Sequence, residues 1–184
     1  GPENILVMAP GVLSGTAAPT SGRISFGAKS HLTGGIKEAN AGGQGAQIQA
    51  RLGYAAIIIE GEWNGEDLYK VMINADGVSI EVANDLKMNT NYQMMEKFKD
   101  IYEKNGAMLS IGTAGEMRLS NSTVAVSDRE ARPTRHAGRG GVGAVMGSKN
   151  LKAVVVTGAV RIPLADPDRF KAFNKKILDF FKQS

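Results

Sequence analysis

Glycine is the feature that most restricts how this chain can fold. The chain has 23 glycines among 184 residues, against a usual share of about 7%. Many of them gather in four stretches, at Pro19–Arg23, Asn40–Gly43, Ile111–Glu116 and Arg135–Gly143. Glycine is needed where the backbone takes a positive φ or where another group approaches the main chain closely. The pattern therefore predicts sharp turns, or the close approach of a ligand, at these places.

Positive charge is spread unevenly along the chain. The net charge is +4, and the segment from Asp128 to Lys152 holds an excess of basic residues. The basic residues of this segment are Arg129, Arg132, Arg135, Arg139, Lys149 and Lys152, and the acidic ones are Asp128 and Glu130. Such a local excess suits a phosphate-bearing ligand. General solubility explains a mildly basic chain equally well, so charge alone leaves both interpretations open.

Composition argues against several kinds of site and location. The chain has no cysteine, so it forms no disulfide and cannot itself ligate an iron–sulfur cluster. Its two histidines, His31 and His136, make a zinc site a poor hypothesis. No apolar run reaches membrane-spanning length and no segment resembles a signal peptide, so we expect a cytoplasmic protein without a membrane partner. Gly1 and Pro2 are typical of a protease-cleavage remnant and are excluded from the fold prediction.

Short apolar runs and alternating patterns predict a chain rich in strands. The expected strands cover residues 5–9, 23–28, 55–60, 68–73, 78–82, 107–111, 122–126 and 151–156. The isoleucine-rich run at 55–60 is the clearest candidate for a buried strand. The turn Asn74-Ala75-Asp76-Gly77 predicts a hairpin between two of these strands.

Helices are expected over residues 42–52, 91–104 and 167–182. Residues 112–115 are predicted to form a turn-rich connector, and residues 127–150 a long loop that runs into a short helix. Asp166 and Pro167 form an N-cap and first-turn pair for the last helix, whose apolar stripe is Phe170, Phe173, Ile177 and Phe181. We assign residues 3–160 to one domain and residues 161–184 to a C-terminal helix or the start of a helical domain.

Familiar nucleotide-binding and nucleophile motifs do not fit the sequence. Gly138, Gly140 and Gly143 match the G-x-G-x-x-G spacing, but the residues before them are polar and include Pro133. A dinucleotide-binding fold needs a strand directly before the first glycine and a full βαβ unit around it, so we interpret this match as accidental. The chain also lacks the phosphate-binding P-loop spacing and any recognisable nucleophile–base pair.

An anion-binding surface is the hypothesis that survives. Bare N–H groups in glycine-rich turns can hold anionic oxygens, and arginine can bind phosphate through two parallel hydrogen bonds. Asn40–Gly43 and Arg135–Gly143, together with Arg23, could form one such floor. The alternative is that the glycines serve turns and packing while the arginines are solvated, and spacing alone does not separate the two.

The residues themselves also resemble a known family, the aldehyde:ferredoxin oxidoreductases, which use a tungsten or molybdenum pterin. The similarity extends from about Asn4 to Val160. It is carried by Ala17-Ala18-Pro19-Thr20-Ser21-Gly22-Arg23, Lys29-Ser30-His31-Leu32-Thr33-Gly34-Gly35, Ala39-Asn40-Ala41-Gly42-Gly43, Leu52-Gly53-Tyr54-Ala55-Ala56-Ile57-Ile58-Ile59-Glu60-Gly61, Ile111-Gly112-Thr113-Ala114-Gly115-Glu116 and the long run from Ala137 to Ala153.

This resemblance implies a fold and a set of site residues. The implied fold is an α+β domain of two β-sheets with peripheral helices, incomplete at its N-terminus, on which a pair of pterins sits. Arg23 would lie between the pterin and a 4Fe–4S cluster. Backbone carbonyls of Asn40 and His136 would bind a magnesium ion that bridges the pterin phosphates. Gly42 and Arg135 would contact pterin or phosphate.

The sequence departs from the family pattern at a few positions. His136 stands where the family commonly has alanine, and Thr113 and His31 stand where it commonly has proline. None of these changes removes a proposed ligand. The family's opening strands and its later helical domains are absent, and those domains supply the cluster cysteines, further pterin contacts and the substrate cavity.

The resemblance implies a complete enzyme that oxidises an aldehyde to a carboxylic acid and passes electrons through the 4Fe–4S cluster to ferredoxin. We expect the chain alone to be inactive and to retain no tungstopterin, magnesium or cluster, and the complete protein could be a homo-oligomer. One alternative is a stand-alone module that binds a pterin or phosphate. A weaker alternative is a basic nucleic-acid binder, but Arg132–Arg139 lacks interleaved aromatic residues, so we expect no nucleic-acid partner.

Overall fold

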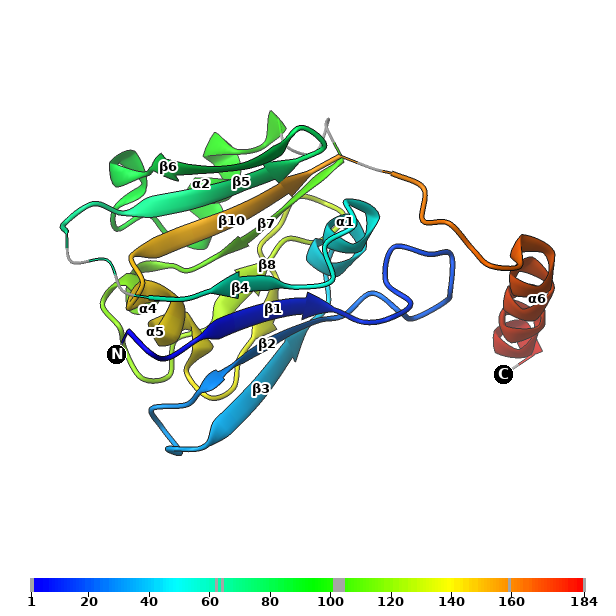
Figure 1. Cartoon of the computed structure of the whole chain (residues 1–184), viewed down its shortest axis with the longest axis horizontal. Coiled ribbons are helices and arrows are strands. Elements are labelled where there is room, and N and C mark those ends of the chain that lie inside the picture. The colour runs from blue at the N-terminus through cyan, green and yellow to red at the C-terminus, as the bar shows by residue number, and fades with distance from the viewer. Residues whose placement is uncertain (1, 62, 64, 101–104, 159, 184) are drawn as a thin grey trace.

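Two β-sheets packed face to face form the body of the molecule (Figure 1). The computed structural model describes residues 2–61, 63, 65–100, 105–158 and 160–183. The chain is therefore an α+β protein with two sheets and a few mostly short helices, as predicted.

The first sheet is antiparallel, with strand order β3-β2-β1-β4. Its strands are β1 (Leu6–Pro10), β2 (Ile24–Lys29), β3 (Ile36–Ala41) and β4 (Ile57–Ile59). On β2 the predicted inner-face residues Ile24, Phe26 and Ala28 are buried. The opposite face of this sheet carries small side chains at its centre, because Ala9 pairs with Ser25 and Val7 pairs with Gly27.

The second sheet is mixed, with strand order β6-β5-β10-β7-β8-β9. Its strands are β5 (Tyr69–Asn74), β6 (Gly77–Val82), β7 (Gly106–Ser110), β8 (Val124–Val126), β9 (Arg135–Ala137) and β10 (Leu151–Thr157). The strand β10 lies at the centre, parallel to β5 and antiparallel to β7. Its first six residues are buried, and all of them except Lys152 are apolar, as in a core strand covered on both faces.

Apolar side chains fill both faces of β10. Val154 and Val156 belong to the main core between the two sheets, whereas Ala153 and Val155 face a second cluster. Helices α1 (Gly45–Arg51) and α5 (Val142–Gly147) each contact strands of both sheets. The second cluster is covered by the methionines of α2 (Asn91–Lys97), so these methionines are core residues, as predicted.

Several other predictions from the pattern are confirmed. The hairpin forms between β5 and β6, and Asn74 Oδ1 accepts hydrogen bonds from Asp76 N at 2.9 Å and Gly77 N at 3.2 Å. Helix α2 begins at Asn91, as predicted, and a capping box formed by Thr90 and Gln93, which was not predicted, caps its start. The helix ends at Lys97, earlier than expected, and residues 101–104 of the predicted helix lie outside the described residues.

Two predictions were wrong or incomplete, and three short elements were not predicted. The isoleucine run forms an edge strand, and Ile58 is 56% exposed. Residues 113–116, predicted as a connector, form the short helix α4 (Thr113–Glu116). Strands β3 and β9 were not expected, because each shows at most two buried residues, too few for an apolar pattern. A 3-10 turn, η1 (Asn84–Leu86), lies before α2.

Helix α6 (Pro167–Gln183) projects from the body and reaches the C-terminal end (Figure 1). Its start is capped as predicted, because Arg169 N donates to Asp166 Oδ1 at 2.9 Å. The predicted apolar stripe is not buried: Phe173 is 62% exposed and Phe181 is 48% exposed. The buried residue on this helix is Asn174.

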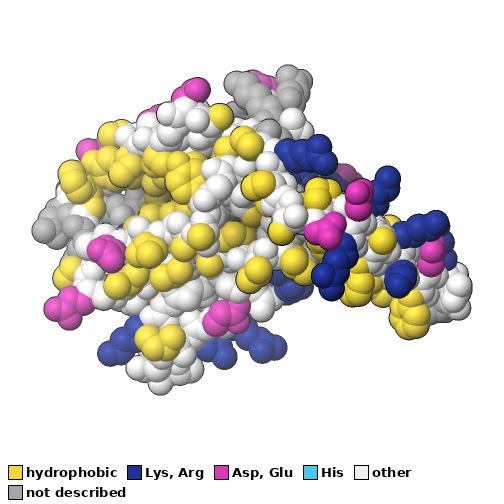
Figure 2. All heavy atoms as spheres, turned by 45° about the vertical axis from the view of Figure 1, so that its right-hand side comes forward, with side chains coloured by type: hydrophobic (Ala, Val, Ile, Leu, Met, Phe, Trp, Pro, Cys, Tyr) yellow, Lys and Arg dark blue, Asp and Glu magenta, His cyan; other side chains and the backbone are white. Residues whose placement is uncertain are grey.

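A hollow with apolar walls lies between β4 and the β5–β6 hairpin (Figure 2). Ile80 on β6 lines this hollow. Val78, Ile80 and Val82 on this edge strand are each at least half exposed. Within the described residues, no helix has both the length and the apolar character needed to cross a bilayer.

Candidate functional site

The edges of the two sheets meet where β3 and β9 contact each other. Each of these strands is paired on one side only, so part of its backbone N–H and C=O groups is not used within its sheet. The end of β3 carries Asn40 and leads into Gly42, and β9 carries Arg135 and His136. The fold therefore brings together two segments that are far apart in the sequence.

Arg23 and Asn40 form a side-chain pair on this edge. The Nε of Arg23 donates to Asn40 Oδ1 at 2.8 Å, and its Nη2 donates to the same oxygen. Both residues are exposed, and Asn40 lies opposite Ser25 on the small-residue face of the first sheet. One guanidinium therefore orients the amide while its remaining N–H groups can bind an acceptor.

Gly42 and Gly43 have different reasons to be glycine. Gly43 has a φ of +96°, and a Cβ there would lie 2.6 Å from the carbonyl oxygen of Ser127. The same oxygen accepts the N–H of Gln44 at 2.8 Å, so Gly43 allows the start of α1 to pack on the end of β8. A Cβ on Gly42 would meet only the side chain of Arg135, at 3.9 Å. Packing among the described residues therefore does not require glycine at Gly42, and its surface is open.

The Arg135 side chain closes the group. It lies beside Gly42 and lines a hollow of about 670 Å³. The residues around this hollow are Thr16–Gly22, Gly43, Gln44, Gln47, Arg51, Asp128, Arg129, Glu130, Arg132, Arg135 and Leu178. We refer to Arg23, Asn40, Gly42 and Arg135 as the edge cradle. Arg23 is hydrogen-bonded to Asn40, Asn40 is two residues from Gly42, and Gly42 contacts Arg135.

Asp128 organises the loop that leads into β9. Its carboxylate accepts from Thr134 Oγ1 at 2.7 Å and from the N–H groups of Glu130 and Arg132 at 2.9 and 3.0 Å. Burial by itself would raise the pKa of Asp128, but these hydrogen bonds and the Arg132 guanidinium outweigh it and lower the pKa. The charged carboxylate is therefore a structural part of the loop that presents Arg135.

His136 faces away from the edge cradle. Neighbouring residues of a strand point to opposite sides, so the His136 ring lies across β9 from the Arg135 side chain. Its Nδ1 is 2.8 Å from Thr123 Oγ1. The predicted role of His136 concerns its main chain, which lies on the same edge strand as Arg135.

The two lysines of the basic segment do not belong to the cradle. Lys149 is buried and donates to the carbonyl oxygen of Gly61 at 2.7 Å. Lys152 is fully buried, donates to the carbonyl oxygen of Asn89 at 2.8 Å and pairs with Glu116. The excess of positive charge that the segment from Asp128 to Lys152 shows at the surface is therefore smaller than its sequence suggests. Its arginines supply that surface charge.

Most glycines of the long motif serve packing. A Cβ on Gly141 would lie 2.3 Å from the carbonyl oxygen of Ser120, and one on Gly143 would lie 2.6 Å from that of Thr123. A Cβ on Gly147 would overlap the carbonyl oxygen of Gly115 in α4. The strand after α5, β10, does not pair with β9, so the motif forms no βαβ unit. The G-x-G-x-x-G spacing is accidental, as predicted.

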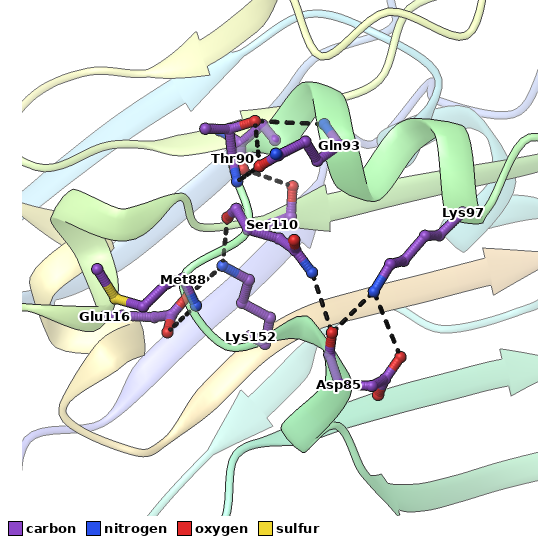
Figure 3. Close-up of polar contacts among 10 residues, drawn as sticks. Asp85, Met88, Thr90, Gln93, Lys97, Ser110, Glu116 and Lys152 are labelled. Carbon is purple, nitrogen blue, oxygen red and sulfur yellow. Dashed lines mark hydrogen bonds and ion pairs between the residues drawn. The ribbon is translucent and has the colours of Figure 1, made fainter.

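Sequence reasoning missed a polar network on the far face of the second sheet (Figure 3). Glu116 accepts the N–H of Met88 at 2.9 Å and pairs with the buried Lys152. Burial lowers the pKa of Lys152, although the carboxylate of Glu116 opposes this effect. Both residues stand in glycine-containing motifs, but nothing in their spacing indicates that they meet. Among the described residues, no cluster of three or more histidines or carboxylates could hold a metal ion.

Known proteins are similar to this chain over nearly its whole length. A family model described as aldehyde ferredoxin oxidoreductase, N-terminal domain, matches residues 1–158. The tungsten-containing aldehyde ferredoxin oxidoreductase of Pyrococcus horikoshii is 42% identical over 172 residues, which is 92% of this chain and 27% of that protein. The aliphatic sulfonate oxidoreductase, WOR-like subunit, of Pyrococcus furiosus is 29% identical and is covered over 30% of its length.

A solved structure has the same fold. The active-site complex BamBC of benzoyl coenzyme A reductase, bound to 1,5-dienoyl-CoA, superposes with a TM-score of 0.90 at 33% identity. The match covers 99% of this chain and 27% of that chain. This chain thus spans only about a quarter of the length of the proteins that it matches.

Proposed function

Because this chain belongs to the aldehyde ferredoxin oxidoreductase family, as its N-terminal domain, we propose that residues 3–160 hold a tungsten bis-pterin cofactor for a longer oxidoreductase. The relative from Pyrococcus horikoshii is an oxidoreductase named for its tungsten. We expect a molybdenum form of the cofactor to use the same protein contacts. When bound, this cofactor supplies the redox chemistry at its metal, and the protein positions and tunes it.

The residues of the edge cradle fit such a ligand. Arg135 can bind a phosphate through two hydrogen bonds, and the open surface of Gly42 lets a flat or bulky group approach the main chain. Backbone carbonyls of Asn40 and His136 lie on two edge strands, where the ladder leaves some of them free. Oxygen ligands of this kind suit the magnesium ion proposed between the pterin phosphates.

Arg23 would orient the pterin from the other side of Asn40. Its guanidinium is already directed by the Asn40 amide oxygen, so less conformational entropy is lost when it binds an acceptor. The small residues Ala9, Ser25 and Gly27 leave the adjacent sheet face open to a flat group. The observation that carries the proposal is the contact between β3 and β9, which joins the two predicted segments into one cradle.

The reaction is a property proposed for the whole protein. We propose that it oxidises an aldehyde to a carboxylic acid, with electrons passing through a 4Fe–4S cluster to ferredoxin. The chain has no cysteine, so ligands for that cluster would come from other domains, for which residues 161–184 would form the first helix. An aldehyde is favoured because the relative at 42% identity is named for it, whereas the relatives named for an aliphatic sulfonate or benzoyl-CoA match at 29% and 33%.

Cofactor analysis of the full-length protein tests the assignment. We expect Arg23→Ala to lower tungsten and pterin per mole of protein, since it loses charge-assisted contacts worth about 1.5–3 kcal/mol. Asn40→Asp should lower them as well, because it adds a negative charge beside the proposed phosphates and pairs with the Arg23 guanidinium. Arg169→Ala on α6 removes the same charge from an exposed site outside the cradle and should keep the full content. Unchanged tungsten and pterin in both cradle variants would refute the site.

The isolated chain offers a second test. If the catalytic centre needs the other domains, the chain of 184 residues reduces no viologen dye in the presence of aldehydes. Aldehyde-dependent dye reduction by the purified chain would contradict the proposal that catalysis needs the other domains.

A further inference from the structure

A second, smaller hollow lies on the opposite side of β9 from the Arg135 side chain. Its volume is about 270 Å³, which suits a ligand of a few non-hydrogen atoms. It is lined by Thr90, Asn91, Tyr92, Gly112, Thr113, Ala114, Gly115, Ser122, Thr123, Pro133 and His136. We call it the β9 side pocket. It shares no lining residue with the larger hollow beside Arg135.

The lining chemistry is polar and lacks fixed charge. None of these residues is Asp, Glu, Lys or Arg, whereas five carry a hydroxyl group, one carries an amide and one an imidazole. A pocket without a carboxylate offers little to a cation, because cations in proteins need anionic or several convergent oxygen ligands. The pocket therefore suits a ligand that accepts hydrogen bonds.

Asn91 is oriented to donate. Ser110 Oγ donates to Asn91 Oδ1 at 3.1 Å, so the amide oxygen is already occupied. The amide nitrogen lies on the side of Gly112, where a Cβ would be 3.7 Å from it. Asn91 and Gly112 both line the pocket. The NH₂ group of Asn91 therefore lies at the pocket wall, where it can donate to a ligand.

Ser122 and His136 complete the set. Ser122 is 5% exposed, and its hydroxyl has no hydrogen-bond partner among the described residues. Buried hydroxyls without a partner are uncommon, so this one is a candidate for a group that pairs when a ligand enters and the wall adjusts. The contact of 2.8 Å between His136 Nδ1 and Thr123 Oγ1 fixes the imidazole, which leaves its Nε2 as the edge for a ligand.

We propose that the β9 side pocket binds a small oxyanion, such as a short carboxylate or inorganic phosphate, through Asn91 and His136. The site is separate from the edge cradle, because strand alternation directs Arg135 and His136 to opposite sides of β9. The two sites are connected by β9 and by the loop before it, which contributes Pro133 to this pocket and Asp128 and Arg132 to the larger hollow.

Histidine NMR gives a direct test on the 184-residue chain. The chain has only two histidines, so ¹⁵N-labelled imidazoles produce two resolved spin systems, and His31 lies in a different hollow. On titration with acetate, and separately with phosphate at constant pH and ionic strength, we expect a saturable shift of the His136 signals while those of His31 stay constant. A saturable shift with either anion supports the site, and the pair of titrations shows which oxyanion it prefers.

Two variants and one control sharpen the result. Asn91→Ala should weaken the fitted Kd by about tenfold, the value of one hydrogen bond of roughly 1.4 kcal/mol. His136→Ala should abolish saturable binding, followed through the backbone amide of Thr123. His31→Gln should bind like the wild type. Equal, non-saturating shifts of both histidines, or unchanged binding in both variants, would overturn the proposal.

Discussion

Replacement of Lys152 by methionine tests whether the buried ion pair holds the molecule together. Lys152 is fully buried, and the side chain of its partner Glu116 is 10% exposed. Methionine is similar in length but cannot donate to Glu116 or to the carbonyl oxygen of Asn89. The variant therefore leaves a carboxylate in the interior with only the N–H of Met88 as a described partner.

The expected loss is large for one substitution. Removal of one member of a buried pair typically costs about 3–5 kcal/mol, since the other charge stays desolvated. For a chain of this size, each kcal/mol lowers the melting temperature by about 2–4 °C, which gives a decrease of roughly 6–20 °C. Urea unfolding followed by circular dichroism, together with a thermal melt, measures both quantities.

Two comparisons separate the charge effect from other causes. Lys97 on α2 forms an exposed ion pair with Asp85 at 3.7 Å (Figure 3). The substitution Lys97→Met should therefore lower the free energy of unfolding by about 1 kcal/mol or less. The double variant Lys152→Met with Glu116→Gln removes both buried charges and should recover most of the loss. A cost for Lys152→Met no larger than for Lys97→Met, or strictly additive losses in the double variant, would refute the reasoning.

Two further predictions concern the loops around the cradle. Gly43→Ala should destabilise the fold by about 1–3 kcal/mol from its positive φ alone, with more from the clash at Ser127, whereas Gly42→Ala should change urea stability by less than about 0.5 kcal/mol; similar losses in both would contradict the packing argument. Asp128→Asn should cost about 1–3 kcal/mol at neutral pH. Because the folded pKa of Asp128 lies below its ordinary 3.8, this stabilisation is present above pH 3.8 and is lost as the pH falls through the lower folded value. Unfolding at pH 7 and near pH 3 checks the sign, and a difference between wild type and variant that persists unchanged in acid would contradict it.

Elements with strong local signals were predictable. The alternation on β2 reports one buried face directly, and the turn at Asn74–Gly77 contains the hydrogen-bonding side chain that shapes it. The strand β10 is apolar on both faces because it lies at the centre of a sheet covered on both sides. In each case the interaction that shapes the element involves only a few neighbouring residues or a single strand, so it leaves a pattern in the local sequence.

Elements at the sheet edges were not predictable. In β3 only Ala39 and Ala41 are buried, and the polar Lys37, Glu38 and Asn40 between and beside them dilute the apolar pattern. The strand β9 has three residues, too few for any periodicity. These weak strands nevertheless carry the candidate site, because an edge leaves backbone groups and polar side chains free for a ligand.

The sequence by itself indicated the α+β class, the central strands and the family, and it predicted which residues form the cradle. Only the tertiary structure decided that Arg23, Asn40, Gly42 and Arg135 lie together, that Lys149 and Lys152 turn inward, and that His136 faces a separate pocket. The reason is physical: periodicity records whether a residue is buried, but not which distant edge packs against it. That choice depends on close contacts such as Gly43 with Ser127, which exist only after both sheets have formed.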